Sequence, residues 1–406
     1  MRFCMVTTFY PPYHFGGDAT YVRALARGLV ARGHSVDVVH CIDAFKIGGG
    51  TPSTQLNDED GVNVHSLKSA MGLLSPLLTQ QLGHPALKHR KLKRLLENDY
   101  DVIHYHNISL VGGPGVLSLG QAPVKLYTLH EHWLLCAMHT FWKYRRQVCD
   151  KRECIRCCVR SGIPPQLWRY TNFINRQLQH VDCLLAPSDY TAERHRRGGI
   201  TAPIKTLPLF SSLDPPLRPR VPHDGPAYFV FAGRVTAEKG IDELLQIIGK
   251  YPRFRLLVIG EGDLLTTLER DYKSYPHIEF LGPLAQESLV DYYRNALALI
   301  YPSSVPETFG LSVVEAFACA TPAVVRRAGA TPEIIESSEA GYVYDSEQEL
   351  ISALDKLVSQ RELRERLGEN ARQAHEDQYR AEHHFDRYLK NIDEFMNHDA
   401  GDNYLS

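Results

Sequence analysis

Two segments in the second half of the chain carry charged residues whose types and spacing could bind a ligand. The first, residues 233–240, reads GRVTAEKG and follows the apolar run 228–232, and a helix is expected from Ile241. Arg234 and Lys239 would then lie beside a helix amino terminus, and a guanidinium, an ammonium and such a terminus all attract phosphate. The alternative is an ordinary surface turn whose charges are solvated. This would be the better interpretation if the Arg and the Lys stood alone in the sequence.

The second segment adds two carboxylates. Glu307 follows the predicted strand 297–301, and Glu315 comes eight residues later, inside a helix that Gly310 is expected to open. Two carboxylates at one edge can each accept hydrogen bonds from vicinal hydroxyls, which a sugar ring and a ribose both offer. Taken alone, Glu315 has an alternative interpretation: it could be an acidic residue near a helix amino terminus that stabilises the helix dipole. The backbone N–H groups after Glu307 predict an anion-binding turn made by Thr308, Phe309, Gly310 and Leu311.

His130 has the most informative position among the 19 histidines of the chain. It ends the predicted strand 124–130 and begins the segment His-Glu-His-Trp. At the carboxyl end of a strand in the first half, its imidazole would point toward a cleft between two domains and could polarise or orient a hydroxyl. The alternative is a structural histidine whose ring is satisfied by its neighbours, as most of the 19 must be.

Five of the nine cysteines fall within 23 residues. In a reducing compartment, four thiolates suit a tetrahedral structural zinc, and the spacing ends in Cys-x2-Cys although its first interval is irregular. Disulfides would suit an oxidising compartment, and free thiols are a further alternative. The zinc ligands expected from this pattern are Cys136, Cys149, Cys154 and Cys157, with Cys158 spare.

These residues need a scaffold, and the apolar pattern predicts one. Short apolar runs alternate with amphipathic stretches, as in βαβ units around a parallel sheet. Neither a G-x-x-x-x-G-K-[ST] loop nor a strict G-x-G-x-x-G after the first strand occurs, which argues against nucleotide hydrolysis and dinucleotide redox chemistry. Strands are expected at residues 2–10, 35–41, 62–67, 101–106, 124–130, 183–187 and 204–209, and then at 228–232, 255–259, 278–281, 297–301 and 323–325.

The best linker is residues 211–226, which hold five prolines and almost no periodic apolar pattern. It divides the 406 residues into an N-terminal domain at 1–210, with the cysteine-rich insertion at about 136–158, and a C-terminal domain at 227–406. From residue 347 on the chain is expected to be helical, and its last helix to return to the N-terminal domain. The predicted fold class is therefore α/β, with two Rossmann-like doubly wound domains facing across a cleft and helices at the C-terminus.

Composition excludes several classes of protein. Hydrophobic residues make up 44% and charged residues 23%, without a low-complexity tract, as in an ordinary globular protein. No apolar run reaches about 18 residues and the start lacks a signal-peptide core, so we expect a cytoplasmic protein without a membrane span. The net charge of −2 conceals +10 in residues 1–210, which hold 25 Lys and Arg against 15 Asp and Glu, and −12 in the rest. An anionic partner is therefore expected on the first half.

One basic stretch predicts peripheral contact with the inner face of a membrane. Residues 85–96 contain five cations within seven positions, and the apolar segment 71–78 precedes them. Such a pair of segments can dock on an anionic lipid surface. The alternative is the solvated face of a helix that packs under the sheet.

Together, the motifs resemble those of the retaining glycosyltransferases with the two-Rossmann GT-B architecture, family 4, also called glycosyl transferases group 1. The resemblance covers nearly the whole chain, and its specificity lies in the joint order of motifs that are weak one by one. Besides the two segments described first, it rests on Tyr10-Pro-Pro with Gly16-Gly17, on Ala186-Pro-Ser188 and on Gly260-Glu261-Gly262.

The resemblance implies a role for each matching residue. Arg234 and Lys239 would hold the diphosphate of a nucleotide sugar, and Glu315 would bind its ribose. Glu307 would contact the sugar hydroxyls and steady the anomeric carbon, so that Glu307 and His130 are the catalytic candidates. The remaining donor-binding candidates are backbone positions at Gly16, Gly17, Gly260, Thr308, Phe309, Gly310 and Leu311.

Two features qualify the resemblance. The family usually has His-Asp where this chain has His130 followed by Glu131, which puts the role of the second position in doubt but not that of His130. A similar cysteine-rich insertion follows the His-x-x-Trp segment in a subset of the family, which implies a shared structural role for it.

The implied function is transfer of a sugar from a nucleotide sugar, UDP- or GDP-linked, to an acceptor hydroxyl with retention of anomeric configuration. The setting would be glycan, lipopolysaccharide, glycolipid or natural-product biosynthesis, and the acceptor a glycan, a lipid-linked sugar or a small molecule. Catalysis would need no cofactor, so that the structural zinc is the sole metal expected, and no nucleic acid partner is expected. Two alternatives are an epimerase or hydrolase of GT-B fold and a non-catalytic scaffold protein that binds nucleotide sugars.

Overall fold

The computed structural model describes residues 1–50, 61–216 and 226–402, without the side chains of residues 398–402. The chain forms two compact α/β units. Unit 1 consists of Met1–His139, Lys151–Leu207 and the chain from Phe385 on, and unit 2 of Thr140–Asp150 and Pro208–His384.

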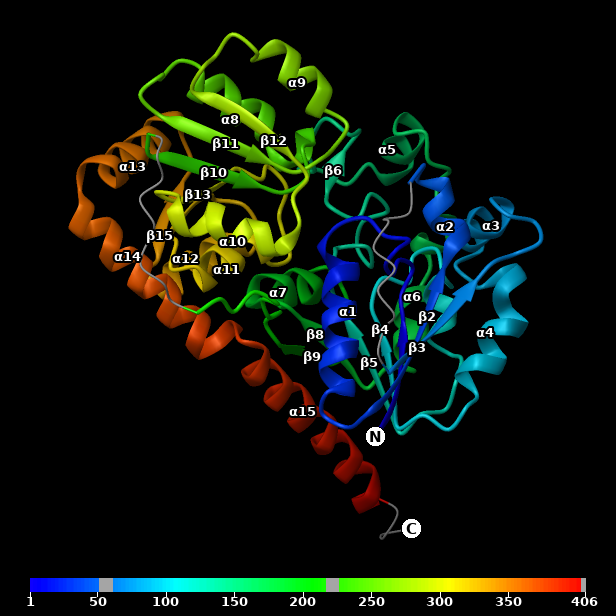
Figure 1. Cartoon of the computed structure of the whole chain (residues 1–406). Coiled ribbons are helices and arrows are strands. Elements are labelled where there is room, and N and C mark those ends of the chain that lie inside the picture. The colour runs from blue at the N-terminus through cyan, green and yellow to red at the C-terminus, as the bar shows by residue number, and fades with distance from the viewer. Residues whose placement is uncertain (51–60, 217–225, 403–406) are drawn as a thin grey trace. The chain divides into compact units, whose positions relative to one another are not determined.

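Unit 1 is built on a seven-stranded parallel sheet with the order β3-β2-β1-β4-β5-β8-β9 (Figure 1). Its strands are apolar and most of them are buried, as expected of parallel strands covered by helices. The order reverses between β1 and β4, which makes the loops after these strands the switch point of the sheet. The strands are β1 (Arg2–Val6), β2 (Ser35–Cys41), β3 (Val62–Leu67), β4 (Val102–Tyr105), β5 (Val124–Thr128), β8 (Cys183–Ala186) and β9 (Ile204–Thr206).

Helices connect these strands. The first, α1, begins at a glycine pair and buries its apolar stripe against the sheet. The helices of unit 1 are α1 (Gly17–Val30), α2 (Ile42–Ile47), α3 (Leu74–Leu82), α4 (His89–Leu96), α5 (Cys154–Arg160), α6 (Phe173–Leu178) and α7 (Asp189–Arg197), with the short turns η1 (Ala86–Lys88), η2 (Pro114–Val116) and η3 (Leu167–Tyr170).

Unit 2 repeats the plan with a six-stranded parallel sheet in the order β12-β11-β10-β13-β14-β15 (Figure 1). Its order reverses between β10 and β13, again at the first strand of the unit. The strands are β10 (Tyr228–Ala232), β11 (Arg255–Ile259), β12 (Ile278–Gly282), β13 (Leu299–Tyr301), β14 (Ala323–Arg326) and β15 (Gly341–Tyr344). The helices are η4 (Ala237–Lys239), α8 (Ile241–Ile248), α9 (Leu265–Asp271), α10 (Gln286–Asn295), α11 (Leu311–Ala318), α12 (Thr331–Ser338), α13 (Glu347–Ser359), α14 (Arg361–Ala374) and η5 (His375–Tyr379).

The predicted α/β class with two doubly wound sheets is confirmed. Expected and observed strands differ mainly at their ends. The first strand stops at Val6, because the prolines at 11 and 12 force a turn in which Tyr10 pairs with Tyr13. The strand expected at 124–130 stops at Thr128. The expected division of the chain differs at 140–150, where the hairpin of β6 (Trp142–Lys143) and β7 (Gln147–Val148) counts with unit 2.

Helices fill the end of the chain, as α13, α14, the single π-turn η5 and α15 (Ala381–Asp402). They are not one continuous helix, because the backbone leaves the helical conformation at Gln360, between α13 and α14, and at Arg380, between η5 and α15. Among the residues that the structure describes, no helix is both long and apolar enough to cross a membrane.

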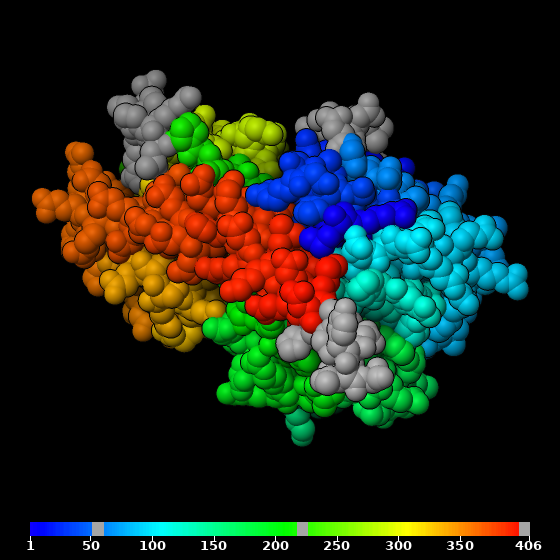
Figure 2. Space-filling model, turned by 90° about the horizontal axis from the view of Figure 1, so that it is seen from below, coloured from blue at the N-terminus to red at the C-terminus, as the bar shows by residue number. Residues whose placement is uncertain are grey.

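From Phe385 on, α15 packs against unit 1 (Figure 2). The Phe385 ring, 1% exposed, lies against α1 so closely that a Cβ at Gly28 would come within 2.2 Å of it. The Arg32 guanidinium lies 3.9 Å from the centre of the same ring. One turn later, the Tyr388 hydroxyl is 2.9 Å from Nδ1 of His104 on β4. The helix therefore completes the core of unit 1.

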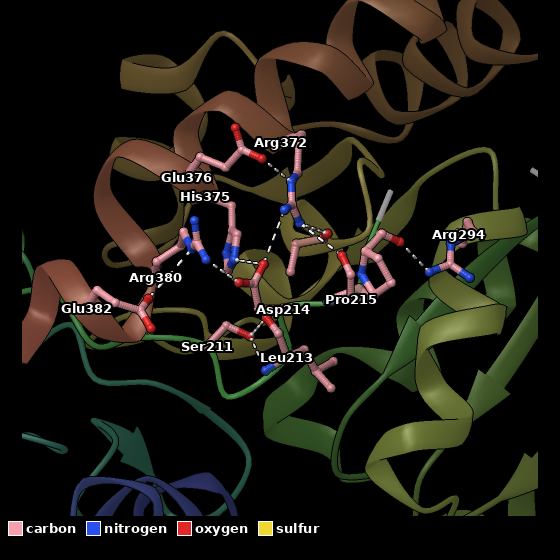
Figure 3. Close-up of polar contacts among 12 residues, drawn as sticks. Ser211, Leu213, Asp214, Pro215, Arg294, Arg372, His375, Glu376, Arg380 and Glu382 are labelled. Atoms are coloured by element: carbon pink, nitrogen blue, oxygen red, sulfur yellow. Dashed lines mark hydrogen bonds and ion pairs between the residues drawn. The ribbon is translucent and has the colours of Figure 1, made fainter. Parts of the chain in front are cut away.

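The start of the predicted linker is tied down by one carboxylate (Figure 3). Asp214 faces the guanidinium of Arg372 at 3.2 Å and that of Arg380 at 2.8 Å, and Nε2 of His375 lies 3.6 Å away. These three side chains come from α14, η5 and the residue before α15. Of the linker predicted at 211–226, residues 217–225 lie outside the described residues.

Candidate active site

The turn after β10 carries the predicted phosphate-binding pair and is shaped by two glycines. A Cβ at Gly260 would lie 1.9 Å from the Gly233 carbonyl oxygen, and one at Gly240 would lie 2.2 Å from the Pro302 carbonyl oxygen. Glycine is therefore required at both positions for the loops after β10, β11 and β13 to meet. The short helix η4 then ends at Lys239, directly before α8.

Lys239 and Glu307 form the central ion pair. Nζ of Lys239 lies 2.6 Å from Oε1 of Glu307, and the Ser303 hydroxyl donates to the same oxygen at 2.6 Å. The two charged side chains are 18% and 17% exposed. Burial alone would raise the pKa of Glu307, but Lys239, Ser303 and Arg234 outweigh it and hold the pKa below its usual value. Glu307 is therefore ionised at neutral pH.

Arg234 lies beside this pair and has its own acidic partner. One guanidinium nitrogen is 2.7 Å from Oε1 of Glu238, and the Thr140 hydroxyl donates to the other oxygen of Glu238 at 3.4 Å. The Arg234 side chain is 48% exposed. A half-exposed ion pair contributes little to stability, so the guanidinium can exchange Glu238 for a more strongly charged anion.

The backbone of Glu307 is held by the loop after β14. Its carbonyl accepts a 2.9 Å hydrogen bond from the Ala330 N–H, and a Cβ at Gly329 would lie 2.2 Å from its nitrogen. Gly310 then takes φ +149°, a conformation that other residues rarely adopt, and caps α11. The segment of Thr308 to Leu311 therefore turns sharply into a helix amino terminus, as an anion site requires.

Glu315 lies on α11, and its environment contrasts with that of Glu307. The Tyr293 hydroxyl lies 3.3 Å from Oε2 of Glu315, and in the part of the chain that the structure describes no basic side chain offsets the effect of burial on its pKa. Burial raises the pKa of Glu315 to about 7, against smaller lowering effects of hydrogen bonds from Tyr293 and Gln286. The two predicted carboxylates thus differ in charge near neutral pH.

Tyr301 is a further residue of the site, which was not predicted from the sequence. It interacts with both predicted carboxylates. Its buried hydroxyl interacts with Glu307, Arg234 and Glu315, and burial followed by the nearby carboxylates raises its pKa well above the usual value. Tyr301 ends β13, so its place at the carboxyl end of a strand before the Glu307 loop was the available signal. Ser303 and Glu238 were missed for a different reason, because their types and spacing fit any loop.

In unit 1, His130 lies just beyond β5 in a row of histidines. Its Nε2 is 3.0 Å from Nδ1 of His106, which follows β4, and the Tyr21 ring of α1 meets it edge-on at 5.3 Å between centroids. Burial lowers the pKa of His130 to about 3, so that the ring is neutral. The pairing with His106 was not predicted, since nothing in the spacing indicated it. Oε1 of Glu131 lies 2.7 Å from Nδ1 of His139.

Gly16 and Gly17 lie at the start of α1, after β1. Gly16 has φ +77° and caps the helix without a side chain, and Gly17 is its first residue. The first helical N–H groups of α1 are therefore not covered by a capping side chain at this end. Close approach of a ligand to this backbone stays a prediction.

The cysteine-rich segment contains the residues predicted to bind zinc. Among the described residues, no three His, Cys, Asp or Glu side chains are arranged to hold a metal ion. Burial lowers the pKa of the Arg169 guanidinium, which stacks on Trp133 and Trp168, and Cys136, Cys158 and Cys154 offset part of that effect. Zinc binding by Cys136, Cys149, Cys154 and Cys157 stays a prediction from spacing alone.

Comparison with known proteins covers both units. The family model of glycosyltransferase family 4 matches residues 15–213, and that of glycosyl transferases group 1 matches residues 216–374. An uncharacterized glycosyltransferase of Methanocaldococcus jannaschii is 26% identical over 92% of this chain and 93% of its own. The glycogen synthase of Mycobacterium tuberculosis is 25% identical over 84% of this chain and 81% of its own.

Solved structures share the fold over the full length. Sucrose-phosphate synthase from Thermosynechococcus elongatus gives a TM-score of 0.73 at 19% identity, covering 98% of this chain and 99% of its own. The Anabaena protein HepE in complex with UDP-glucose gives 0.65 at 18% identity, covering 99% and 100%.

Two doubly wound units, a Lys–Glu pair at the switch point of the second, and these likenesses define a glycosyltransferase of the GT-B fold. Within that class, the chain belongs to family 4, the glycosyl transferases group 1. The resemblance predicted from the order of the motifs is thereby confirmed.

Proposed function

We propose that the protein transfers a sugar from a nucleotide sugar to an acceptor hydroxyl and retains the anomeric configuration. The observation that carries the proposal is the 2.6 Å pair of Lys239 and Glu307, with Arg234 and the amino terminus of α11 beside it. HepE, which shares the fold, is known in complexes with UDP and with UDP-glucose. That likeness supports a nucleotide-sugar donor and makes UDP-sugars, ahead of GDP-sugars, the first to test.

The basic groups of unit 2 would stabilise the leaving diphosphate. As the sugar–phosphate bond breaks, negative charge grows on the phosphate, and Arg234, Lys239 and the N–H groups before α11 offer positive charge in fixed positions. Preorganised charge of this kind is often the largest single contribution to catalysis. Arg234 would release Glu238 to do so. Because two cations supply the charge, we expect transfer without a divalent metal.

Glu307 would act on the sugar itself. Its depressed pKa keeps it ionised, so that it can accept hydrogen bonds from the sugar hydroxyls and stabilise positive charge at the anomeric carbon. Lys239, bonded to the same carboxylate, links the sugar and phosphate ends of the donor. Glu315 would accept the ribose hydroxyls, and Gly260 would keep the phosphate side of the turn free of side chains.

Unit 1 would hold the acceptor. His130 is neutral, so it can orient the attacking hydroxyl through a hydrogen bond without adding charge. The net charge of +10 in residues 1–210 favours acceptors that carry phosphate, such as a lipid-linked sugar, over neutral glycans or small molecules. Biosynthesis of polysaccharide or glycolipid is the corresponding setting.

The decisive experiment compares variants of the central pair with a matched pair elsewhere in unit 2. Lys239→Ala and Glu307→Gln are tested beside Lys250→Ala and Glu347→Gln, because Lys250 and Glu347 form an exposed 2.9 Å ion pair. The readout is nucleotide release from a panel of UDP- and GDP-sugars, with and without acceptors and chelator. Removing one preorganised group should lower turnover about 100-fold to 1000-fold. The Lys250 and Glu347 variants should match the wild type.

The product then separates this proposal from the alternatives. Nuclear magnetic resonance of the new glycosidic bond should show the anomeric configuration of the donor. Inversion would refute retention, and nucleotide release with free sugar as the sole product would favour a hydrolase. Binding of a nucleotide sugar with no release under any acceptor would favour the scaffold protein. Near wild-type turnover by Lys239→Ala would refute the site assignment.

A further inference from the structure

Helix α3 of unit 1 buries two polar side chains and exposes apolar ones. Ser75 and Thr79 are fully buried, and both hydroxyls bond the amine of the buried Lys88, at 3.1 and 3.0 Å. On the same helix, Leu74 and Leu77 are 39% and 40% exposed. A helix of a water-soluble protein normally buries its apolar stripe and exposes its polar one. The Lys88 contacts hold α3 in the opposite orientation.

The exposed apolar surface continues beyond α3 onto η3. The Trp168 indole donates to the Gln80 carbonyl at 2.9 Å, and the Gln81 amide donates to the Pro164 carbonyl at 3.3 Å. These bonds fix η3 beside α3, where Leu167 is 68% exposed. We call the resulting surface the apolar face, and it consists of Leu73, Leu74, Leu77, Leu82, Leu167 and Tyr170.

This concentration of apolar side chains is specific to one region. Fifteen large hydrophobic residues are exposed in the described part of the chain, and ten of them lie in residues 71–87 and 155–170. Single exposed leucines are normal on proteins, whereas a contiguous group marks a surface that binds something. α5 borders the same region, because the Tyr170 side chain reaches the backbone of Ile155.

The charges around the apolar face are almost all positive. Residues 68–96 contain six Lys and Arg and no Asp or Glu. Of these, α4 exposes Arg90, Lys91, Lys93 and Arg94, and α4 continues directly from η1, which packs on α3. On the other border, α5 exposes Arg156 and Arg160. Leucines flanked by exposed cations match an anionic lipid surface, since the cations meet headgroups while the apolar side chains enter the interface.

We propose that the apolar face docks unit 1 on a bilayer that contains anionic phospholipids. Leu74, Leu77 and Leu167 enter the interface, and the cations of α4 contact the lipid phosphates. Lys88 serves this contact indirectly, because it draws the polar side of α3 inward and leaves the leucines outside. The inference does not depend on the identity of the donor or acceptor.

The test is sedimentation of the full chain with vesicles of phosphatidylcholine alone and of phosphatidylcholine mixed with phosphatidylglycerol. The apolar variant is Leu74→Ser with Leu77→Ser, and its control is Val358→Ser, an exposed valine on α13. The charge variant is Arg90→Gln, Lys91→Gln and Arg94→Gln, and its control is Lys273→Gln with Arg366→Gln, two exposed cations of unit 2.

The wild type should bind the anionic vesicles at least about tenfold better than the neutral ones, and salt should weaken the binding. One cation near such a surface contributes about fivefold, so the charge variant should lose roughly 100-fold. The apolar variant should lose at least about tenfold, since it removes the side chains that enter the interface. Both controls and Glu307→Gln should bind like the wild type, which separates this inference from the proposed function.

Three results would overturn the proposal. Equal binding to both kinds of vesicle would show that anionic lipid is not recognised. Wild-type binding by both variants would show that the apolar face and the cations of α4 are not the membrane contact. Light scattering of the protein alone gives the third: a dimer that Leu74→Ser with Leu77→Ser dissociates would mean that a second copy covers the apolar face. The circular dichroism of the variants must match that of the wild type, which shows that they fold. The charge variant changes only exposed side chains, so it should not disturb the fold.

Discussion

If Glu315 binds the ribose of the donor as proposed, its raised pKa should make donor binding depend on pH in a way that can be measured. The carboxylate is buried beside Tyr293, and among the described residues no cation is a cause of its pKa shift. To accept hydrogen bonds from both ribose hydroxyls, Glu315 must be ionised. Below its pKa of about 7, binding must therefore first remove a proton.

The magnitude follows from that value. For a group that must lose a proton to bind, the apparent dissociation constant is multiplied by one plus ten to the power of pKa minus pH. With a pKa of about 7, the factor is about 11 at pH 6, about 2 at pH 7 and about 1.1 at pH 8. Affinity for the donor should thus rise about tenfold from pH 6 to pH 8.

The assay is isothermal titration calorimetry with UDP-glucose between pH 5.5 and 8.5. A nucleotide sugar is preferable to UDP, since its diphosphate has no terminal phosphate group that titrates in this range. The matched variant is Glu315→Gln, which keeps the shape of the side chain but cannot ionise. Its affinity should be low and independent of pH, approaching that of the wild type at the acidic end. Glu307→Gln should keep the slope of the wild type.

Stability gives an independent check with a defined sign. The folded pKa of Glu315, about 7, lies above the ordinary value of 4.5. Its contribution to stability is therefore complete below about pH 4.5 and is lost as pH rises through 7, by roughly 3 kcal/mol. The Tm of the ligand-free wild type should fall over this range relative to that of Glu315→Gln. A wild-type affinity that is flat from pH 6 to 8, or a slope that persists in Glu315→Gln, would refute the reasoning.

Three further predictions concern packing and positioning. Phe385→Ala should destabilise the protein by about 3–5 kcal/mol in chemical denaturation, because the ring fills the space above Gly28; a loss below about 1 kcal/mol would mean that α15 is peripheral to the core. Gly260→Ala should abolish nucleotide binding in calorimetry, since its Cβ would lie 1.9 Å from a carbonyl oxygen, and normal binding would contradict the required contact. His106→Phe should lower turnover on an acceptor while leaving donor affinity unchanged, because His106 positions His130 at 3.0 Å; unchanged turnover would leave the pair without a catalytic role.

Much of the fold could be predicted because buried parallel strands appear in a sequence as short apolar runs between turn residues. The Lys239 and Glu307 segments could be located for a related reason: both follow such a run, and loops after parallel strands meet at one edge. The contact between them depends on Gly240 and Gly329 allowing the loops to approach, which no pattern of residue types reveals. The pairing of His106 with His130 likewise depends on the neighbouring order of β4 and β5.

The orientation of α3 shows a limit of predicting the buried face of a helix from its hydrophobic periodicity. An amphipathic pattern indicates that a helix has two faces, and the usual assumption is that the apolar one is buried. Here Lys88, the first cation of the basic stretch at residues 85–96, lies inside the protein, and its amine bonds two hydroxyls. A buried cation that attracts the polar face can therefore reverse the assignment, and only the coordinates reveal it.

The packing of α15 on unit 1 has a consequence for synthesis on the ribosome. The first unit lacks its last helix until the whole of the second has been translated, since Phe385 and Tyr388 follow Pro208–His384 in the chain. At an elongation rate of about 5–20 residues per second, the apolar surface around Gly28 and His104 stays exposed for roughly 10–35 seconds before α15 is synthesised. Nascent chains of this protein should therefore be clients of chaperones that bind exposed apolar segments, and a fragment ending at Leu207 should aggregate more readily than the full chain.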